Sequence, residues 1–340
     1  MSGEPQGRDL QDQDLHGRCP RVAAIVLSYN GREVTLEALE SLSHMSYPNY
    51  DLIVVDNGST DGTYEAVEET FPAVTLLRTE TNLGAAGGCN LGIRHAMESG
   101  YDYLLILNND IEVDRDMLSE LLAVIQPDPT IGCVGPKEYF YGDRQRIWSA
   151  GGILRFRESI TTERGSGQID QGQFDRDAEV DYINGCAMLM RREAVAQTGL
   201  WDPLFHLAVE DADFCTRMKT HGFRCWYVHR AKLWHMVSYA TGVYKPGKTF
   251  QTGRSTALYM RRYANPWQKL TTLAFVALTL PLAFLRELPK GNQGAAISKA
   301  KGFLDGLRAP MTAPPQLAAS QAPSQESPDK SMMDSRSSGN

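Results

Sequence analysis

The chain has 340 residues, of which 42% are hydrophobic and 22% are charged, a composition typical of a globular protein with a large core. A formal net charge of −7 argues against a general nucleic-acid binder, which would normally be basic. The six cysteines form no CxxC pair and no evident disulfide framework, so a zinc site is not indicated and reduced thiols in the cytoplasm are expected.

The two ends of the chain differ from its middle. Residues 1–20 are polar and acidic without an apolar stretch, which predicts a disordered tail and no conventional secretory signal. Residues 309–340 are rich in Pro, Ser, Ala and Gln, and this composition also predicts disorder.

Apolar runs alternate with helical periodicity through the first third of the chain. This alternation predicts an α/β fold with a mainly parallel sheet, flanking helices and right-handed crossovers. The expected strands are residues 21–28, 51–56, 74–77 and 103–107. The expected helices are residues 33–43, 63–71 and 90–99.

Beyond residue 116 the alternation weakens. The first half resembles a nucleotide-binding unit, and the second half should supply the site of another substrate on the same sheet. Here we expect helices at 117–125, from 192 onward and at 211–221, strands at 132–136 and 225–229, hairpins within 140–180 and a further apolar segment at 180–190.

Residues 270–285 contain no charged side chain. As a helix they would extend about 24 Å, short of the roughly 30 Å hydrocarbon core of a bilayer, and Pro281 would kink them. Basic residues flank the segment and Trp267 stands at its start, which favours an interfacial or re-entrant membrane anchor. A buried helix or a contact between copies of the chain is the alternative.

The strand at 103–107 runs into Asn108-Asn109-Asp110. The carboxyl ends of buried strands are where ligands bind in open α/β sheets, and the carboxylate of Asp110 suits a hard cation. A turn or capping aspartate is the alternative. It is less favoured here because Tyr29-Asn30 and Asp56 also follow strands and should meet Asp110 along one edge.

Asp56 ends the second strand and is placed to accept a hydrogen bond from a nucleobase or a ribose, although turn-forming aspartates are common. The glycine-rich loop that contains Asn82 and Gly84 would let backbone amides approach a phosphate near a helix N-terminus. An ordinary glycine turn explains such a loop equally well.

The adjacent carboxylates Glu210 and Asp211 open a predicted helix. Crowded carboxylates raise the pKa of one of them, which would suit a general base. The alternative is an acidic first turn that the helix dipole stabilises. His235 is a candidate metal ligand only if it faces Asp110.

Several motifs, in this order, resemble family 2 glycosyltransferases of the GT-A fold, and the subgroup they resemble is rhamnosyltransferase- and galactofuranosyltransferase-like. The resemblance covers residues 21–265, and implies a nucleotide-sugar-binding half at 21–115 and an acceptor and catalytic half at 116–265. For residues 266–308, beyond the resemblance, we expect a helical, membrane-associated segment because of the apolar stretch described above. The motifs are Ile25–Asn30, Ile53–Gly62, Asn82–Gly84 with Gly87–Asn90, Leu107–Asp110, Asn184–Met188, Gly199–Pro203, Glu210-Asp211 and His235.

The resemblance implies an inverting, metal-dependent transfer of a hexose such as rhamnose from a dTDP- or UDP-sugar. The acceptor would be a hydroxyl of a glycan or lipid-linked molecule in cell-envelope polysaccharide synthesis, at the cytoplasmic face of the membrane. Asp110 and His235 would hold Mg²⁺ or Mn²⁺, although Asn108 replaces the aspartate that many members carry. Asp211 would be the catalytic base, beside Glu210.

The remaining site residues implied by the resemblance fall into two groups. The nucleotide-sugar-binding group is Leu27, Tyr29, Asn30, Asp56, Asn82, Gly84, Asn109 and Asp110. The candidate acceptor-binding group is Asn184, Gly185, Trp201 and Phe205, and the alternative for Trp201 is a core residue.

Two other functions stay open from the sequence. A sugar nucleotidyltransferase would normally carry a glycine-rich loop with Lys or Arg after the first strand, for which Ser28–Arg32 is a poor substitute. The second is a non-catalytic scaffold that binds a sugar nucleotide. Such a protein would not have to keep Asp110, Asp211 and His235 all together.

Overall fold

The computed structural model describes residues 19–237 and 246–317. Its strands are β1 (Val22–Ser28), β2 (Tyr50–Asp56), β3 (Thr75–Arg78), β4 (Tyr103–Asn108), β5 (Ile111–Val113), β6 (Ile131–Phe140), β7 (Asp143–Ser149), β8 (Gly152–Leu154), β9 (Thr161–Glu163), β10 (Ala178–Val180), β11 (Ala187–Arg191) and β12 (Arg224–His235). Its helices are α1 (Arg32–Ser43), α2 (Thr63–Thr70), α3 (Gly84–Glu98), α4 (Met117–Ile125), α5 (Arg192–Thr198), α6 (Glu210–Thr220), α7 (Pro246–Tyr263), α8 (Pro266–Glu287) and α9 (Gln293–Arg308), with a short 3₁₀ turn, η1 (Leu288–Lys290).

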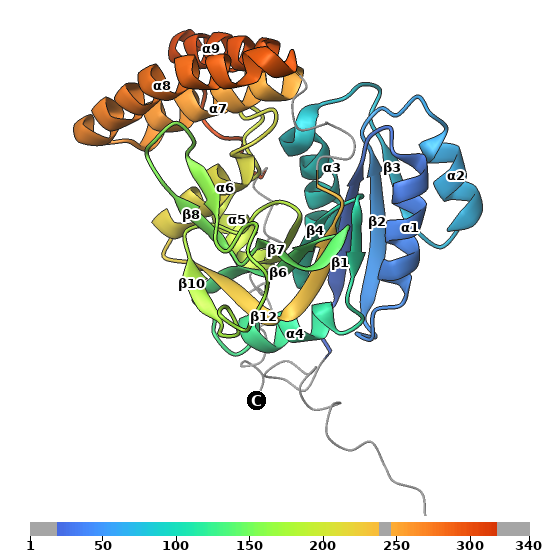
Figure 1. Ribbon diagram of the computed structural model, residues 1–340. Helices are drawn as coiled ribbons and strands as arrows, with labels where there is room; N and C mark the ends of the chain where they lie inside the picture. The colour runs from blue at the N-terminus through green and yellow to red at the C-terminus, as the bar shows by residue number, and fades with distance from the viewer. Residues whose placement is uncertain (1–18, 238–245, 318–340) are drawn as a thin grey trace, which may run out of the picture.

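One large sheet organises most of the described chain, in the order β10-β12-β6-β11-β4-β1-β2-β3 (Figure 1). Outside this order, β5 pairs with β12 and β7 pairs with β6, and β8 forms a separate hairpin with β9. In Figure 1, α7, α8 and α9 form a distinct layer at one end of the molecule, coloured orange to red.

The half of the sheet that contains β1, β2, β3 and β4 is parallel, as the strand–helix alternation predicts. The register pairs Ser28 with Asp56 and Leu27 with Asn108, so the carboxyl ends of three strands lie at one edge. This confirms the expectation that their polar ends meet.

Alternate residues of the central strands enter two different cores. On β4, Leu104 and Ile106 pack in the core that includes α3, α5 and α6, whereas Leu105 and Leu107 pack in the core that includes α1 and α4. Because both faces are covered, a continuous apolar run is stable here without polar alternation.

The other half of the sheet is mixed. Strand β11 lies antiparallel between β4 and β6, and β12 runs parallel to β6. Strand β6 continues to Phe140, although its apolar run predicts an end at Pro136. Likewise β12 extends to His235 instead of ending at His229, because its pairing with β6 resumes after a register shift between Val228 and Lys232.

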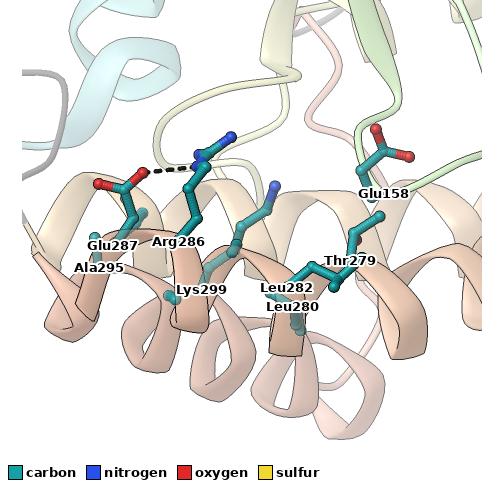
Figure 2. A pocket seen from close by; sticks show the side chains of 11 residues that line it. Glu158, Thr279, Leu280, Leu282, Arg286, Glu287, Ala295 and Lys299 are labelled. Carbon is teal, nitrogen blue, oxygen red and sulfur yellow. Dashed lines mark hydrogen bonds and ion pairs between the residues drawn. The ribbon is translucent and has the colours of Figure 1, made fainter. Parts of the chain in front are cut away.

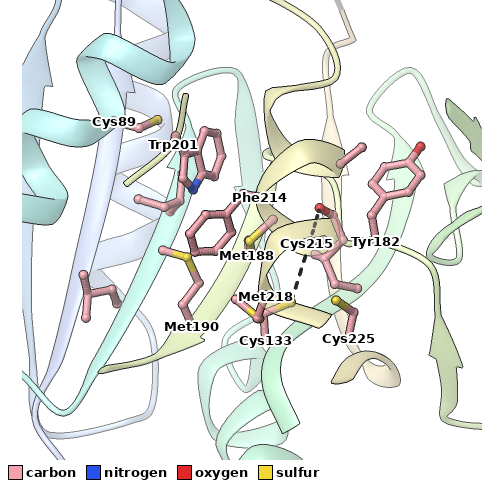
Figure 3. Close-up of a cluster of buried hydrophobic side chains, with 14 of the residues drawn as sticks. Cys89, Cys133, Tyr182, Met188, Met190, Trp201, Phe214, Cys215, Met218 and Cys225 are labelled. Atoms are coloured by element: carbon pink, nitrogen blue, oxygen red, sulfur yellow. Dashed lines mark hydrogen bonds between the residues drawn. The ribbon is translucent and has the colours of Figure 1, made fainter. Parts of the chain in front are cut away.

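The larger core contains three fully buried thiols, from Cys133, Cys215 and Cys225, beside Phe214 and Met218 (Figure 3). The sulfur atoms of Cys133 and Cys215 lie 3.9 Å apart. All six cysteines lie within the described ranges as free thiols, as their scattered spacing predicts. In this core they act as small apolar side chains.

Helices α7 and α9 pack unusually closely. A Cβ added at Gly302 would lie 1.9 Å from the carbonyl oxygen of Phe250, and one at Gly253 would lie 2.1 Å from that of Lys299. A Cβ at Gly306 would meet the carbonyl of Arg254 at 2.4 Å. These three glycines, which we call the glycine seam, let the two backbones approach closely because they carry no side chain.

Helix α8 contrasts with its neighbours, because much of its apolar surface is exposed. The helical stretch Pro266–Lys290 is long and apolar enough to cross a membrane, and only 11% of its most apolar window is buried. It is longer than residues 270–285 alone, and Pro281 lies inside the continuous helix. A buried helix, one of the two alternatives for this segment, is therefore wrong.

Residues 309–317 lie in the segment whose composition predicts disorder, yet they contact the core. The Pro315 carbonyl accepts a hydrogen bond from Leu200 N at 3.0 Å, and the Thr312 carbonyl accepts one from Arg262 at 3.0 Å. These contacts correct the prediction for residues 309–317. The remainder of both predicted tails, residues 1–18 and 318–340, lies outside the described residues.

Candidate active site

Asp56 lies at the carboxyl end of β2 with its side chain fully buried. One carboxylate oxygen, Oδ1, accepts a hydrogen bond from Ser59 N at 2.7 Å. The other, Oδ2, is buried and has no partner among the described residues. A buried acceptor without a partner is costly, so this oxygen is suited to a donor group of a ligand, as predicted for a nucleobase.

The loop after β1 is fastened to the loop after β2. Asn30 N donates to the Ser59 hydroxyl at 3.0 Å, and the Asn30 side chain accepts from Thr60 N at 2.8 Å. Asn30 adopts a φ of 47°, a conformation that asparagine tolerates better than most residues. Tyr29 is 39% exposed beside this loop, where its ring is available to a ligand.

The glycine-rich loop belongs to α3, which begins at Gly84 and not at Asn90 as predicted. Asn82 accepts a hydrogen bond from Gly84 N at 2.8 Å. Gly84 has a φ of 76°, and an added Cβ would lie 2.4 Å from Nδ1 of His206. Leu27 lines the same region, since a Cβ on Gly88 would lie 2.4 Å from it. Glycine is required at 84 by both backbone geometry and space.

Asn109 is almost fully buried between β4 and α1. Its amide nitrogen donates to Thr35 Oγ1 at 2.8 Å and to Ser28 Oγ at 3.3 Å. Its –NH₂ group is therefore already engaged, and a ligand hydroxyl would meet the amide oxygen instead.

Asp110 and His235 converge, which is the arrangement that makes His235 a candidate ligand. Oδ1 of Asp110 lies 3.2 Å from Nε2 of His235, and the two residues are 7% and 8% exposed. Met236 N donates to the Asp110 carbonyl at 2.9 Å, which holds the end of β12 against the end of β4. The Nδ1 atom of His235 is buried without a partner in the described structure.

A carboxylate oxygen and an imidazole nitrogen in contact form a donor pair that fits Mg²⁺ or Mn²⁺, with the imidazole favouring Mn²⁺. A second carboxylate lies nearby, because ligand atoms of Glu138, Cys186 and His235 fall within 4.8 Å of one another. The residues present are therefore compatible with a divalent cation at this edge of the sheet.

Asp211 lies in the first turn of α6, in the second half of the chain. Its Oδ2 accepts from Gly185 N at 2.9 Å, and Oδ1 accepts from Ala212 N at 2.7 Å. Burial raises the pKa of Asp211 to about 7, against the lowering effect of these two hydrogen bonds. Burial and the charge of Asp211 also raise the pKa of Glu210 well above its usual range.

The segment before Asp211 is strained. Ala208 and Val209 have φ values of 67° and 73°, which are unusual for residues that carry a Cβ. Helix α7 holds the segment from outside, since Arg254 donates to the Leu204 carbonyl at 2.7 Å and Ser255 donates to the Leu207 carbonyl at 3.2 Å. Strain of this kind persists only when neighbouring structure enforces it, and it clusters at functional sites.

Of the candidate acceptor residues, Asn184 and Gly185 lie beside Asp211. Asn184 donates to Glu138 at 3.0 Å, and Gly185 binds the Asp211 carboxylate as described above. Trp201 and Phe205 are 1% and 0% exposed, so they are core residues and the prediction that they form an acceptor surface is wrong. Their aromatic character reflects packing, for example of Trp201 against Phe214.

Three residues of the site were not anticipated. Glu138, on the part of β6 beyond Pro136, is 2% exposed, and burial together with Glu163 raises its pKa well above the usual range. Glu163 accepts hydrogen bonds from Ser149 and Tyr182, both at 2.5 Å. The Trp148 ring packs edge-on to His235, with 6.1 Å between centroids. The signal for Glu138 was hidden because Pro136 suggested that the strand ended there.

The fold of the chain is similar to that of solved glycosyltransferases of the GT-A class. GalNAc-T7 with UDP, GalNAc and Mn²⁺ superposes with a TM-score of 0.57 at 16% identity, over 74% of this chain and 53% of that one. The mannosyltransferase PcManGT from Pyrobaculum calidifontis, in complex with GDP-Man and Mn²⁺, gives a TM-score of 0.54 at 20% identity, over 85% and 87%. These similarities establish the fold.

The sequence profile of glycosyl transferase family 2 matches residues 23–199, more than half of the chain. The protein belongs to this family. Among curated relatives, the poly-beta-1,6-N-acetyl-D-glucosamine synthases of Staphylococcus epidermidis and Staphylococcus aureus are 25% and 26% identical, over 70% and 69% of this chain. The chain spans about half the length of these relatives, 55% and 53% respectively.

Proposed function

We propose that the protein is an inverting, metal-dependent hexosyltransferase that uses a nucleoside diphosphate sugar. What supports the proposal is that Asp56 and the Asp110–His235 pair follow parallel strands that end at one edge of the sheet. Asp211 accepts a hydrogen bond from Gly185 N, and the next residue, Cys186, accepts one from Asn108 N at the end of β4. The family membership supports it, as do the two structural neighbours, which were solved with UDP or GDP-Man and with Mn²⁺.

On the donor side, Asp56 would accept from the base, and Tyr29 would lie beside it. Asn30, Asn82, Gly84 and Leu27 would shape the remaining wall. Asp110 and His235 would hold a divalent cation, whose chemistry is to neutralise the charge that develops on the departing diphosphate. The donor we propose is a dTDP- or UDP-hexose such as the rhamnose derivative.

On the acceptor side, Asp211 would take the proton of the attacking hydroxyl. A carboxyl with a pKa of about 7 is half ionised at neutral pH, and it holds the abstracted proton better than an ordinary aspartate does. Gly185 N fixes the orientation of the carboxylate. Direct attack from the face opposite the diphosphate would invert the anomeric centre.

We further propose that the acceptor is a glycan or lipid-linked molecule of the cell envelope, glycosylated at the cytoplasmic face of the membrane. The exposed apolar surface of α8 supports a membrane location, because Trp267 is 71% exposed at its start and basic residues follow at its end. A contact between copies of the chain through the same surface is the alternative use of α8.

The proposal is tested by incubating the protein with UDP- and dTDP-hexoses in Mn²⁺ or Mg²⁺ and measuring nucleoside diphosphate release. The anomeric configuration of any product is then read by NMR. Inverted product from one donor is the expected result, whereas retained configuration would contradict the base assignment. Pyrophosphate release from a nucleoside triphosphate would instead indicate a sugar nucleotidyltransferase, and donor binding without turnover would indicate a scaffold.

A further inference from the structure

A cavity of about 470 Å³ lies between α8 and α9, away from the residues of the candidate active site (Figure 2). Leu280, Leu282 and Ala283 line it from α8, and Ala295 and Ala296 line it from α9. Its volume falls within the range of small-molecule sites, roughly 300–1,000 Å³. We call it the C-terminal groove.

The groove owes its shape to a mismatch of side-chain size. Small alanines on α9 face leucines on α8, so the two helices leave space where α7 and α9, joined by the glycine seam, leave none. Its α8 wall runs from Thr279 to Glu287, which corresponds to about 12 Å of helix. The leucine and alanine part of a groove of this length suits an extended hydrocarbon chain, and its polar lining residues leave room for a polar head group.

The groove opens onto the apolar surface of the helix. Leu282 lines the groove and is also 57% exposed, while Leu278 and Leu285, one turn to either side, are 62% and 61% exposed. A chain that enters the groove can therefore stay in contact with apolar surface along its whole path. Exposed apolar surface on this scale marks an interaction site for a lipid or a protein.

The charges of the groove favour an anionic group at one place. Arg286 lies 2.8 Å from Glu287, and Lys290 also contacts Glu287, so both of these cations already have an ion pair with the same carboxylate. Lys299 lines the groove without a hydrogen bond or ion pair to any residue of the described chain, and Figure 2 shows it between Arg286 and Glu158. Burial lowers the pKa of Lys299, which Glu158 partly opposes.

Helix α7 also contributes to the lining of the groove, through Thr249.

We propose that the C-terminal groove binds the alkyl or isoprenyl chain of a phosphate ester, with the phosphate against Lys299. Leucine and alanine side chains in the lining, an opening onto exposed leucines and a lysine without an ion pair to any described residue together favour this class of amphiphile, although Glu158 lines the same groove. Two sources share the chemistry, a membrane phospholipid and a lipid-linked acceptor. The second source rests on the proposed transferase function, whereas the binding site itself does not.

The test uses the full chain and dodecyl phosphate below its micellar concentration, with dodecyl maltoside as the uncharged probe, and binding is measured by calorimetry. Ala296→Trp fills the groove and should lower the binding affinity for both probes by at least about tenfold. Leu304→Trp, on the exposed face of α9, is the matched control and should bind as the unmodified chain does. Unchanged binding by Ala296→Trp overturns the proposal.

Lys299→Gln tests the phosphate contact and also serves if Ala296→Trp fails to fold. This substitution should lower the affinity for dodecyl phosphate by about tenfold, because a charged hydrogen bond is lost. The affinity for dodecyl maltoside should not change. Lys301→Gln, exposed on the same helix, should change neither. Equal losses for both probes by Lys299→Gln would refute the placement of the phosphate.

Two further measurements decide whether the natural ligand is the lipid-linked acceptor or a membrane phospholipid. If the ligand is the acceptor, Ala296→Trp raises KM for a long-chain acceptor and leaves KM for a short-chain acceptor unchanged. If it is a phospholipid, Ala296→Trp reduces binding to anionic vesicles while the two KM values keep their ratio. Absence of any transferase activity, combined with dodecyl phosphate binding, would contradict the proposed function and leave the groove assignment in place.

Discussion

Strand β4 and helix α8 are both runs of large apolar residues, but they occupy opposite environments. Leu104 and Leu107 are fully buried, with neighbouring strands on both edges and helices on both faces. Leu278 and Leu285 of α8 are 62% and 61% exposed. The same apolar composition therefore stabilises the core in β4 and leaves a surface for another molecule on α8. The neighbouring elements, and not the composition, distinguish the two segments.

The largest expected effect lies at the site that the buried region supports. Asp211→Asn should lower the rate of transfer by about 10²–10⁴-fold, because a positioned base is lost while the hydrogen bond from Gly185 can be kept. In the unmodified chain, kcat/KM should rise with pH through about 7 as Asp211 loses its proton. A steady-state pH profile measures both, and an unchanged profile in Asp211→Asn would reject the base assignment.

Matched truncations of leucine test the comparison directly. Leu105→Ala should cost about 2–5 kcal/mol of the free energy of unfolding, because it leaves a cavity in a fully packed core. Leu282→Ala, on the half-exposed wall of the groove, should change it by less than about 0.5 kcal/mol. Urea unfolding of both variants gives the values. Equal costs would mean that α8 is buried in solution, for instance between two copies of the chain.

A metal-binding experiment compares the roles of two histidines on the same strand, His235 and His229. His235→Ala should weaken Mn²⁺ binding in the presence of nucleoside diphosphate by at least about tenfold, since it removes one proposed ligand. His229→Ala removes the ion pair with Asp177 at 2.5 Å and should leave Mn²⁺ affinity unchanged. Electron paramagnetic resonance of free Mn²⁺ reports the affinities, and equal losses would point to a structural role for His235.

The smallest expected effect concerns the exposed region alone. Replacing Leu278 and Leu285 together by serine should reduce partition into anionic vesicles by about three- to tenfold, because apolar area is removed from the interface. The melting temperature should stay within about 2 °C, since neither side chain is buried. A large fall in melting temperature with unchanged partition would mean that these leucines of α8 stabilise the folded protein and do not contact a membrane.

Much of the fold could be predicted because the parallel half obeys local rules. Each of β1, β2 and β4 is an apolar run that ends in a polar residue, and this pattern locates both the strand and its functional end. The second half is harder because β11 and β12 depend on pairing between residues distant in the sequence. The extension of β6 past Pro136 has no local signal.

The candidate site divides in the same way. Asp56, Asp110 and Asp211 stand at ends of elements, where their chemistry can be recognised from position alone. Glu138 could not be found from the sequence, since its importance depends on β6 bringing it beside His235. Trp201 was misassigned because a tryptophan in a loop suggests a binding surface, whereas here Asn90 fixes its backbone inside the core through hydrogen bonds of 2.8 and 2.9 Å.

The glycine seam has a consequence for natural variation. Helix α7 braces the strained segment before Asp211, and the closest approach of α9 to α7 is where glycines 253, 302 and 306 let the backbones touch. Homologues that keep the C-terminal layer should therefore keep glycine at all three positions. Homologues that have lost α9 should be free to vary at 253, and covariation among the three positions would then record how often evolution has gained or discarded this layer.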